Sequence, residues 1–143
     1  MKEIFVAGRV LLGSYFVFGG LHHFTDTAMM THFAHAKGVP LPELAVVVAG
    51  ALLIIAGLSL LLGLAPKVGI AATALFLVPV TLMMHQFWKE EGAARMADMV
   101  NFTKNFGLLG AVLMLAAVPE PWPISVDSRW AFTRRRRVPV FNH

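Results

Sequence analysis

The sequence has no cysteine among its 143 residues and few charged residues of any kind. Without cysteine the chain cannot form a disulfide, a thiolate metal site, a CxxC redox motif or a cysteine nucleophile. Lysine, arginine, aspartate and glutamate together make up 14% of the residues, against about 25% in soluble domains. The hydrophobic fraction is 57%. A soluble protein of this size could not hide so much apolar surface, so lipid must cover it.

Other motifs are absent as well, and their absence argues against several classes of enzyme. The sequence contains no phosphate loop, no nucleotide-binding motif and no nucleophile–base pattern, which disfavours a stand-alone hydrolase or NTPase. The net charge of +4 does not indicate a nucleic-acid partner, because four of the twelve basic residues are consecutive arginines at 134–137. Such a cluster is typical of a cytoplasmic flank of a membrane protein.

Four apolar segments approach the ~20 residues that a transmembrane helix needs. They are residues 4–21, 44–64, 68–87 and 100–118. None of them contains Asp or Glu, so no carboxylate pair is available for a proton relay within the bilayer. A short amphipathic helix at about residues 25–37 is expected to lie along the membrane surface after the first span. The predicted fold is an all-α integral membrane four-helix bundle at residues 1–118, followed by a basic cytoplasmic tail at 119–143.

The distribution of Lys and Arg predicts that both termini are cytoplasmic. In that orientation seven basic residues lie inside and four outside, and the arginine-rich tail supplies most of the difference. Trp88, at the outer end of the third span, is then expected to anchor the helix at the interface. Arg9 lies within the first span, where it is expected to snorkel inward or to pair with Glu3 or a lipid phosphate.

Small residues recur at helical spacing and predict where the helices touch. Helices in lipid associate through close backbone contact, so glycines and alanines mark their seams. One stripe of the first span, spaced i, i+4, i+7, i+11 and i+14, is expected to face the bundle: Arg9, Gly13, Phe16, Gly20 and His23. Gly50 and Gly57 in the second span and Gly107 and Ala111 in the fourth are expected to mark further seams.

Polar side chains gather at the outer ends of the predicted spans, and six of the eight methionines lie at or near the same face. The polar residues are His22, His23, His32, His35, His85, Asn101, Lys104 and Asn105. Ionisable groups this near the hydrocarbon are candidates for function.

Three functional uses of these polar residues remain open, beside a purely structural one. His and Lys donors could hold a quinone head group. His22 or His23 with His85 could bind a metal or haem, because imidazole and thioether suit Cu(I) and imidazole alone suits Zn²⁺ or haem iron. His32 and His35 form a further metal-site candidate, although their spacing also arises by chance. In the structural alternative, the side chains only hydrogen-bond between helix ends at headgroup level.

Several short motifs together resemble the DoxX family of small bacterial membrane proteins. They are GRVLLG at residues 8–13, FGGLHHF at 18–24, GVPLP at 38–42, HQFW at 85–88, FTKN at 102–105 and LLG at 108–110. The resemblance covers about residues 5–118 and implies a four-helix bundle in a bacterial inner membrane. The family is named after a small subunit associated with thiosulfate:quinone oxidoreductase, and other members look like accessory subunits in redox or metal-related operons. The positions that match the motifs, and so form the candidate cofactor site, are Arg9, His85, Trp88, Lys104 and Asn105.

The sequence therefore predicts a multi-pass bacterial inner-membrane protein with a polar His/Lys pocket at the periplasmic face. We expect a redox-associated or quinone-linked subunit of an oxidoreductase system rather than a stand-alone enzyme, with quinone, haem or copper as the candidate cofactor. The alternative is a non-catalytic accessory protein that handles copper or anchors a partner. The expected partners are the lipid bilayer and another subunit or further copies of the chain, and no nucleic acid.

Overall fold

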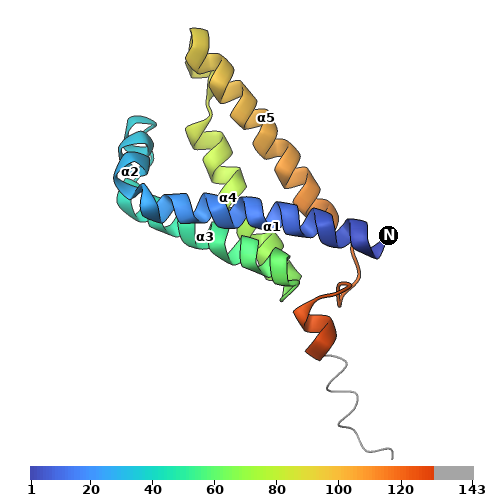
Figure 1. The fold of residues 1–143 in the computed structure, drawn as a ribbon. Coiled ribbons are helices and arrows are strands. Elements are labelled where there is room, and N and C mark those ends of the chain that lie inside the picture. Colours follow the sequence, from blue (N-terminus) through green and yellow to red (C-terminus); the bar gives the residue numbers. More distant parts are fainter. Residues whose placement is uncertain (131–143) are drawn as a thin grey trace, which may run out of the picture.

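The chain is almost entirely helical. The structure, a computed structural model, describes residues 1–130, and within them it contains no strand. Figure 1 shows the order of the elements along the chain. They are α1 (Lys2–Thr25), α2 (Thr27–Ala36), α3 (Pro42–Leu62), α4 (Pro66–Met84), the 3-10 turn η1 (Phe87–Lys89) and α5 (Gly92–Leu115). The arginines at 134–137 lie outside the described residues, so the predicted basic tail is described only in part.

Proline and glycine set the boundaries of the two central helices. Pro42 and Pro66 open α3 and α4 in their first turns, where the missing N–H of proline costs no hydrogen bond. Gly63 closes α3 at a φ of 61°, a conformation that glycine adopts without the steric cost a side chain would meet. Both helices consequently begin two residues earlier than expected. Pro79 lies inside α4, which ends at Met84.

The first and third helices pack so closely that only glycine fits along their seam. A Cβ built on Gly13 would lie 2.9 Å from the carbonyl oxygen of Gly57, and one built on Gly20 would lie 3.0 Å from that of Gly50. Within α1 the buried residues are Arg9, Gly13, Phe16 and Gly20. The predicted packing stripe is confirmed for these four residues, while His23 is only half-buried.

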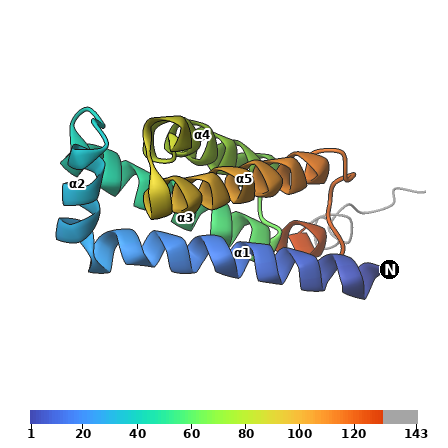
Figure 2. The ribbon, with the colours of Figure 1, turned by 90° about the horizontal axis from the view of Figure 1, so that it is seen from above.

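The helices converge at one end of the bundle and separate at the other. In Figures 1 and 2, α1 runs along α3, while α4 lies between α3 and α5. Near the N-terminus α5 approaches α1, and a buried core joins them through Phe16, Leu77, Val112 and Trp122. From there α1 and α5 diverge toward the end that holds α2 (Figure 1). This divergence positions the site described below.

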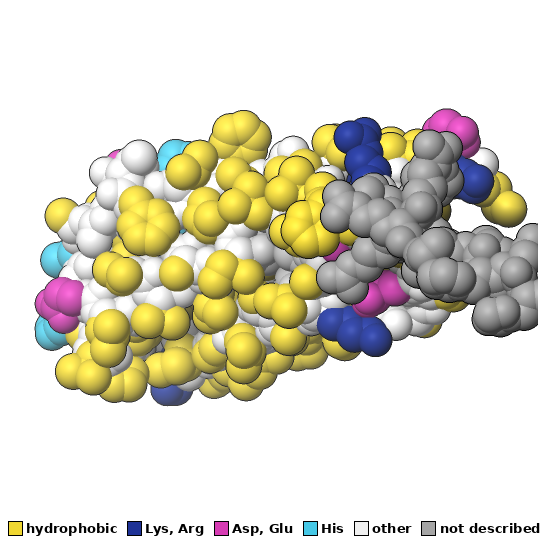
Figure 3. All heavy atoms as spheres, turned by 90° about the horizontal axis from the view of Figure 1, so that it is seen from below, with side chains coloured by type: hydrophobic (Ala, Val, Ile, Leu, Met, Phe, Trp, Pro, Cys, Tyr) yellow, Lys and Arg dark blue, Asp and Glu magenta, His cyan; other side chains and the backbone are white. Residues whose placement is uncertain are grey.

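By length and apolar composition, three helical segments within residues 1–130 could cross a membrane. They are Lys2–Thr25, Pro42–Leu62 and Pro66–Lys89. The fourth expected span falls in α5, whose first half carries polar residues such as Arg95, Asp98 and Asn101. This helix is not among the candidates. In the view of Figure 3, hydrophobic side chains cover the middle of the molecule, with histidines at one end and most of the visible lysines and arginines at the other.

One packing expectation does not hold within the described chain. A Cβ on Gly107 would meet nothing within 4 Å, and the same is true of Gly110. Gly107 therefore marks no seam between helices of residues 1–130. The reason is geometric: α5 turns this face outward and uses other residues, such as Val112, to pack on the core.

Candidate functional site

A cavity of about 580 Å³ opens where α1 and α5 diverge. Its polar residues come from three parts of the chain: His22 and His23 from α1, His85 at the end of α4, and Lys104 and Asn105 from α5. Its other walls are mostly apolar and include Phe18, Met30, Phe33, Leu53, Phe76, Leu77, Val80 and Met84. The structure thus brings five of the predicted site residues to one cavity, with a polar group of side chains set against an apolar lining.

Asn105 is the polar residue most deeply placed in this cavity. It is 6% exposed, and its side-chain amide forms no hydrogen bond with any residue of the described chain, although it lines the open space. The amide atoms keep contact with the open space, because among residues 1–130 the only fully buried side-chain polar atom without a partner is Nε of Arg9. Buried amides are ordinarily satisfied by protein, water or ligand, so this one is available to a molecule in the cavity.

His85 is held in place by an acid that the sequence analysis did not single out. His85 follows the last residue of α4, and its Nδ1 lies 3.3 Å from Oδ1 of Asp98. Lys37, just after α2, donates a hydrogen bond of 2.7 Å to Oδ2 of the same carboxylate, and one of 2.6 Å to Glu90. These four residues, His85, Asp98, Lys37 and Glu90, form a charged network that joins α2, η1 and α5 beside the cavity.

The network favours the charged forms of Asp98 and Lys37, although both side chains are partly buried. Burial raises the pKa of Asp98, but the hydrogen bonds from Lys37 and His85 outweigh burial and leave the pKa below its ordinary value. The hydrogen bonds to Asp98 and Glu90 raise the pKa of Lys37. Asp98 precedes Asn105 by seven residues, so both fall on one face of α5. That spacing is the signal in the sequence that could have identified Asp98.

The two adjacent histidines of α1 differ in their surroundings. His22 is exposed, and its Nδ1 lies 3.0 Å from a carboxylate oxygen of Asp26. His23 turns inward, with Nδ1 at 2.8 Å from the carbonyl oxygen of Gly19 and its ring edge-on to Phe76 at 6.0 Å. Of the pair, His23 is the one whose ring is fixed against the bundle.

Two residues of the candidate cofactor site lie elsewhere. Arg9 is 4% exposed and donates hydrogen bonds to the carbonyl oxygens of Ile124 at 2.7 Å and Pro123 at 3.4 Å. It therefore neither snorkels nor pairs with Glu3, which contacts the N-terminal amine instead. Arg9 precedes His23 by fourteen residues on α1, so it lies about 20 Å along the helix axis from the His23 end of the cavity. Trp88 packs edge-on against Phe87 and Phe102 rather than lining the cavity.

The remaining metal-site candidates are not assembled by the fold. His32 and His35 are exposed on α2, and they line neither this cavity nor the smaller one that adjoins it. Among residues 1–130, no group of three or more His, Asp or Glu side chains is arranged to hold a metal ion. The metal site at His22, His23 and His85 stays a prediction.

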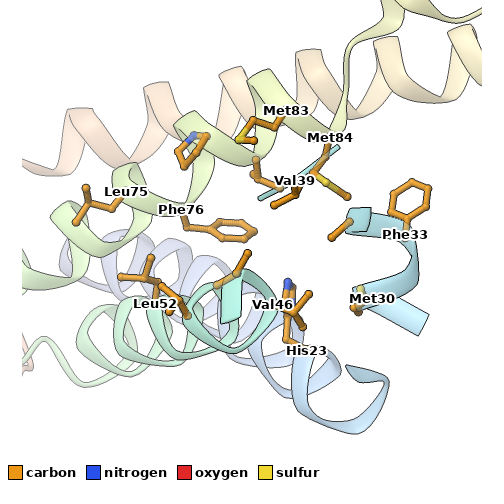
Figure 4. A pocket seen from close by; sticks show the side chains of 16 residues that line it. His23, Met30, Phe33, Val39, Val46, Leu52, Leu75, Phe76, Met83 and Met84 are labelled. Atoms are coloured by element: carbon orange, nitrogen blue, oxygen red, sulfur yellow. The ribbon is translucent and has the colours of Figure 1, made fainter. Parts of the chain in front are cut away.

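A second cavity of about 250 Å³ adjoins the first, between α2, α3 and α4. Figure 4 shows its side chains, with Met83 and Met84 on α4, Phe33 and Met30 on α2, and His23 reaching in from α1. Six residues line both cavities: His23, Met30, Phe33, Phe76, Val80 and Met84. Beyond these shared residues, the polar cavity therefore continues into a cavity that is almost wholly apolar.

Comparison with known proteins agrees with this picture of apolar helices. A family model described as DoxX matches residues 4–86. The Inner membrane protein YphA of Escherichia coli (strain K12) is 30% identical over 92 residues, which are 64% of this chain and 65% of YphA. No solved structure is significantly similar to the chain. The family match includes Arg9, the paired histidines and His85, and it ends before Trp88, Lys104 and Asn105. Because it spans more than half of the sequence, including α1, α3 and α4, this chain is a membrane protein of the DoxX family.

Proposed function

We propose that the protein is a quinone-binding, redox-associated component of a bacterial inner membrane, with the polar cavity at the periplasmic face. The observation that carries the proposal is the unpartnered amide of Asn105 on the wall of a cavity in which a few polar side chains stand against an apolar lining. A quinone has the matching chemistry, because its carbonyl oxygens accept hydrogen bonds while its ring and tail are apolar.

The topology follows from the same arrangement. In the proposal α1, α3, α4 and α5 all cross the bilayer, α5 from about residue 100 to residue 118, and both termini are cytoplasmic. Arg9, Gly63 and the segment at 122–125 then lie together on the inner side, and His85 and Asn105 lie toward the outer side. The charged first turns of α5 would stand above the hydrocarbon, together with α2 and the network around Asp98.

The dimensions of the cavities agree with a quinone. The polar cavity, at about 580 Å³, lies within the ~300–1,000 Å³ that small-molecule sites occupy. Asn105 and Lys104 would donate hydrogen bonds to a carbonyl oxygen of the ring, and Phe76 and Leu77 would pack on its faces. The adjoining apolar cavity would take the first part of the tail. Electrons would pass to or from another subunit, which makes the protein a component of a larger system.

A test requires a variant that removes the hydrogen-bonding group without disturbing the fold. Asn105→Leu has that property, because the amide has no protein partner to lose and leucine is of similar size. Purified protein in nanodiscs is extracted for co-purifying quinone and titrated with decylubiquinone. We expect the wild type to bind and Asn105→Leu to weaken binding at least about tenfold, the loss of roughly one hydrogen bond. Thr103→Val is the matched control, since Thr103 is exposed and bonds only within its own helix.

The proposal is wrong if the wild type neither retains nor binds quinone, or if Asn105→Leu binds it as the wild type does. A second candidate, copper handling, is favoured by one observation. Met30, Met83, Met84 and His23 line the apolar cavity (Figure 4), and thioether and imidazole are the ligands that Cu(I) prefers. Elemental analysis of the same preparation separates the two, because only copper handling requires stoichiometric copper.

A further inference from the structure

The hydrogen bond between His85 and Asp98 has a consequence for the chemical form of the ligand. In the neutral imidazole one ring nitrogen carries a proton and the other has a free lone pair. Asp98 is an ionised acceptor at 3.3 Å from Nδ1, so the proton of neutral His85 resides on Nδ1. The free lone pair is then on Nε2. This nitrogen has no partner among the described residues, and His85 lines the polar cavity.

A carboxylate on one imidazole nitrogen also makes the other a better proton acceptor. The negative charge of Asp98 stabilises the imidazolium that forms when Nε2 takes up a proton, and it fixes the ring orientation. Asp98 is itself held by Lys37, whose ammonium lies 2.7 Å from the second carboxylate oxygen. The side chain of His85 is only 16% exposed, so bulk water has limited access to compete for the proton.

We propose that the cavity takes its quinone in the reduced, hydroxyl-bearing form, a quinol, and that His85 accepts the hydroxyl proton. This inference rests on the proposed function, since it concerns the same ligand site. The O–H bond of the quinol breaks, the proton forms an N–H bond at Nε2, and the electron pair stays on the oxygen. Lys104 and Asn105, which line the same cavity, would stabilise the resulting oxyanion. Asp98 acts as a positioning residue, because it works through the imidazole ring.

The charges of the other groups around the cavity affect the stability of the oxyanion. The titratable and charged residues that line the cavity or contact the His85 network are Tyr15, His22 and His23 on α1, Lys37 after α2, Glu90 before α5, and Asp98 and Lys104 on α5. Both carboxylates are bound to Lys37, whose single positive charge offsets one of the two negative charges. Among residues 1–130, Lys104 is the cation that lines the cavity, and its ammonium donates a hydrogen bond of 2.7 Å to the side-chain amide oxygen of Asn101.

A phenol whose anion absorbs visible light tests this step without any electron transfer. An alkylated 4-nitrophenol serves as the quinol stand-in, and its absorbance against pH is measured free and bound to the protein in nanodiscs. We expect binding to lower the pKa of the phenol by at least about one unit, a tenfold gain in the ionised fraction. His85→Gln should abolish the shift and Asp98→Asn should reduce it. His32→Gln, at an exposed histidine outside the cavity, should leave it unchanged.

The outcomes separate this inference from the proposed function. If decylubiquinone binds but the bound phenol titrates as it does in solution, the hydroxyl form is excluded while quinone binding stands. An unchanged shift in both His85→Gln and Asp98→Asn also overturns the inference. If neither quinone nor phenol binds, both proposals fail. The wild-type titration decides the question even where a variant is too unstable to purify.

Discussion

The seam between α1 and α3 permits a quantitative prediction from glycine alone. Gly57→Ala would place a Cβ 2.6 Å from Cγ2 of Val17 and 2.7 Å from two backbone atoms, the carbonyl oxygen of Gly13 and the amide nitrogen of Val17. Real Cβ atoms essentially never lie within 3.0 Å of such atoms. A side-chain atom could rotate away, but two backbone atoms cannot. The helices must therefore separate by several tenths of an ångström along this contact.

The separation loosens the packing of α1 on α3 and so lowers the free energy of unfolding. Overpacking of a close-packed core costs about 1–3 kcal/mol, and the loss here includes the Gly13 and Gly20 approaches along the same seam. A second glycine of the same chain provides the matched control, and its expected effect on stability has the opposite sign. Gly107→Ala meets nothing within 4 Å, so only helix propensity changes, and alanine is favoured over glycine by up to about 1 kcal/mol.

The measurement is the free energy of unfolding of both variants in the same detergent. Unfolding by SDS is monitored by the circular dichroism signal of the helices. We expect Gly57→Ala to be less stable than the wild type and Gly107→Ala to be equally or slightly more stable. The two variants should differ by about 2 kcal/mol or more, which is the sum of the packing and propensity effects. Equal stability of the two variants would refute the packing described for α1 and α3. A strongly destabilised Gly107→Ala would mean that α5 is covered by another chain.

Three further predictions rest on other contacts. Arg9→Met removes the hydrogen bonds to Pro123 and Ile124. In the same titration it should lower the free energy of unfolding by about 2 kcal/mol, and it should expose the 122–125 segment to protease. Unchanged proteolysis would contradict the proposal that Arg9 holds this segment. Because the pKa of Asp98 is lowered in the folded state, its contribution to stability is present above the ordinary carboxyl value, about 3.9, and is lost as the pH falls below it; acid titration should show this loss in the wild type and not in Asp98→Asn. Since the chain has no cysteine, single variants report topology directly: His35→Cys should react with an impermeant maleimide in intact cells and Lys67→Cys should not, and the reverse pattern would overturn the proposed orientation.

Composition and periodicity were enough to predict the membrane class and much of the helical frame. The apolar runs are local features, so three of the predicted spans coincide with helices that could cross a membrane. The buried stripe of α1 was also predictable, because an α-helix returns to the same face every three to four residues and small residues mark contact in lipid. The motifs at its two ends pointed to the DoxX family, which the comparison confirms.

The candidate site was predictable as a set of residue types and only partly as a constellation. His85, Lys104 and Asn105 do meet in one cavity with His22 and His23. Arg9 does not join them, and its partners lie 114 and 115 residues further along the chain. No local pattern encodes such a pairing, because it depends on where the last helix returns to the first.

The sequence by itself thus determined that the protein lies in lipid and which faces of its helices are buried. Both properties follow from the free energy of transferring each side chain between water and lipid. Tertiary structure alone decided that α1 and α5 diverge to leave a cavity, that Asn105 has no partner there, and that Asp98 orients His85. Those properties depend on distances between residues far apart in the chain. Such distances are set by helix crossing and by the glycine seam, not by the residues that line the cavity.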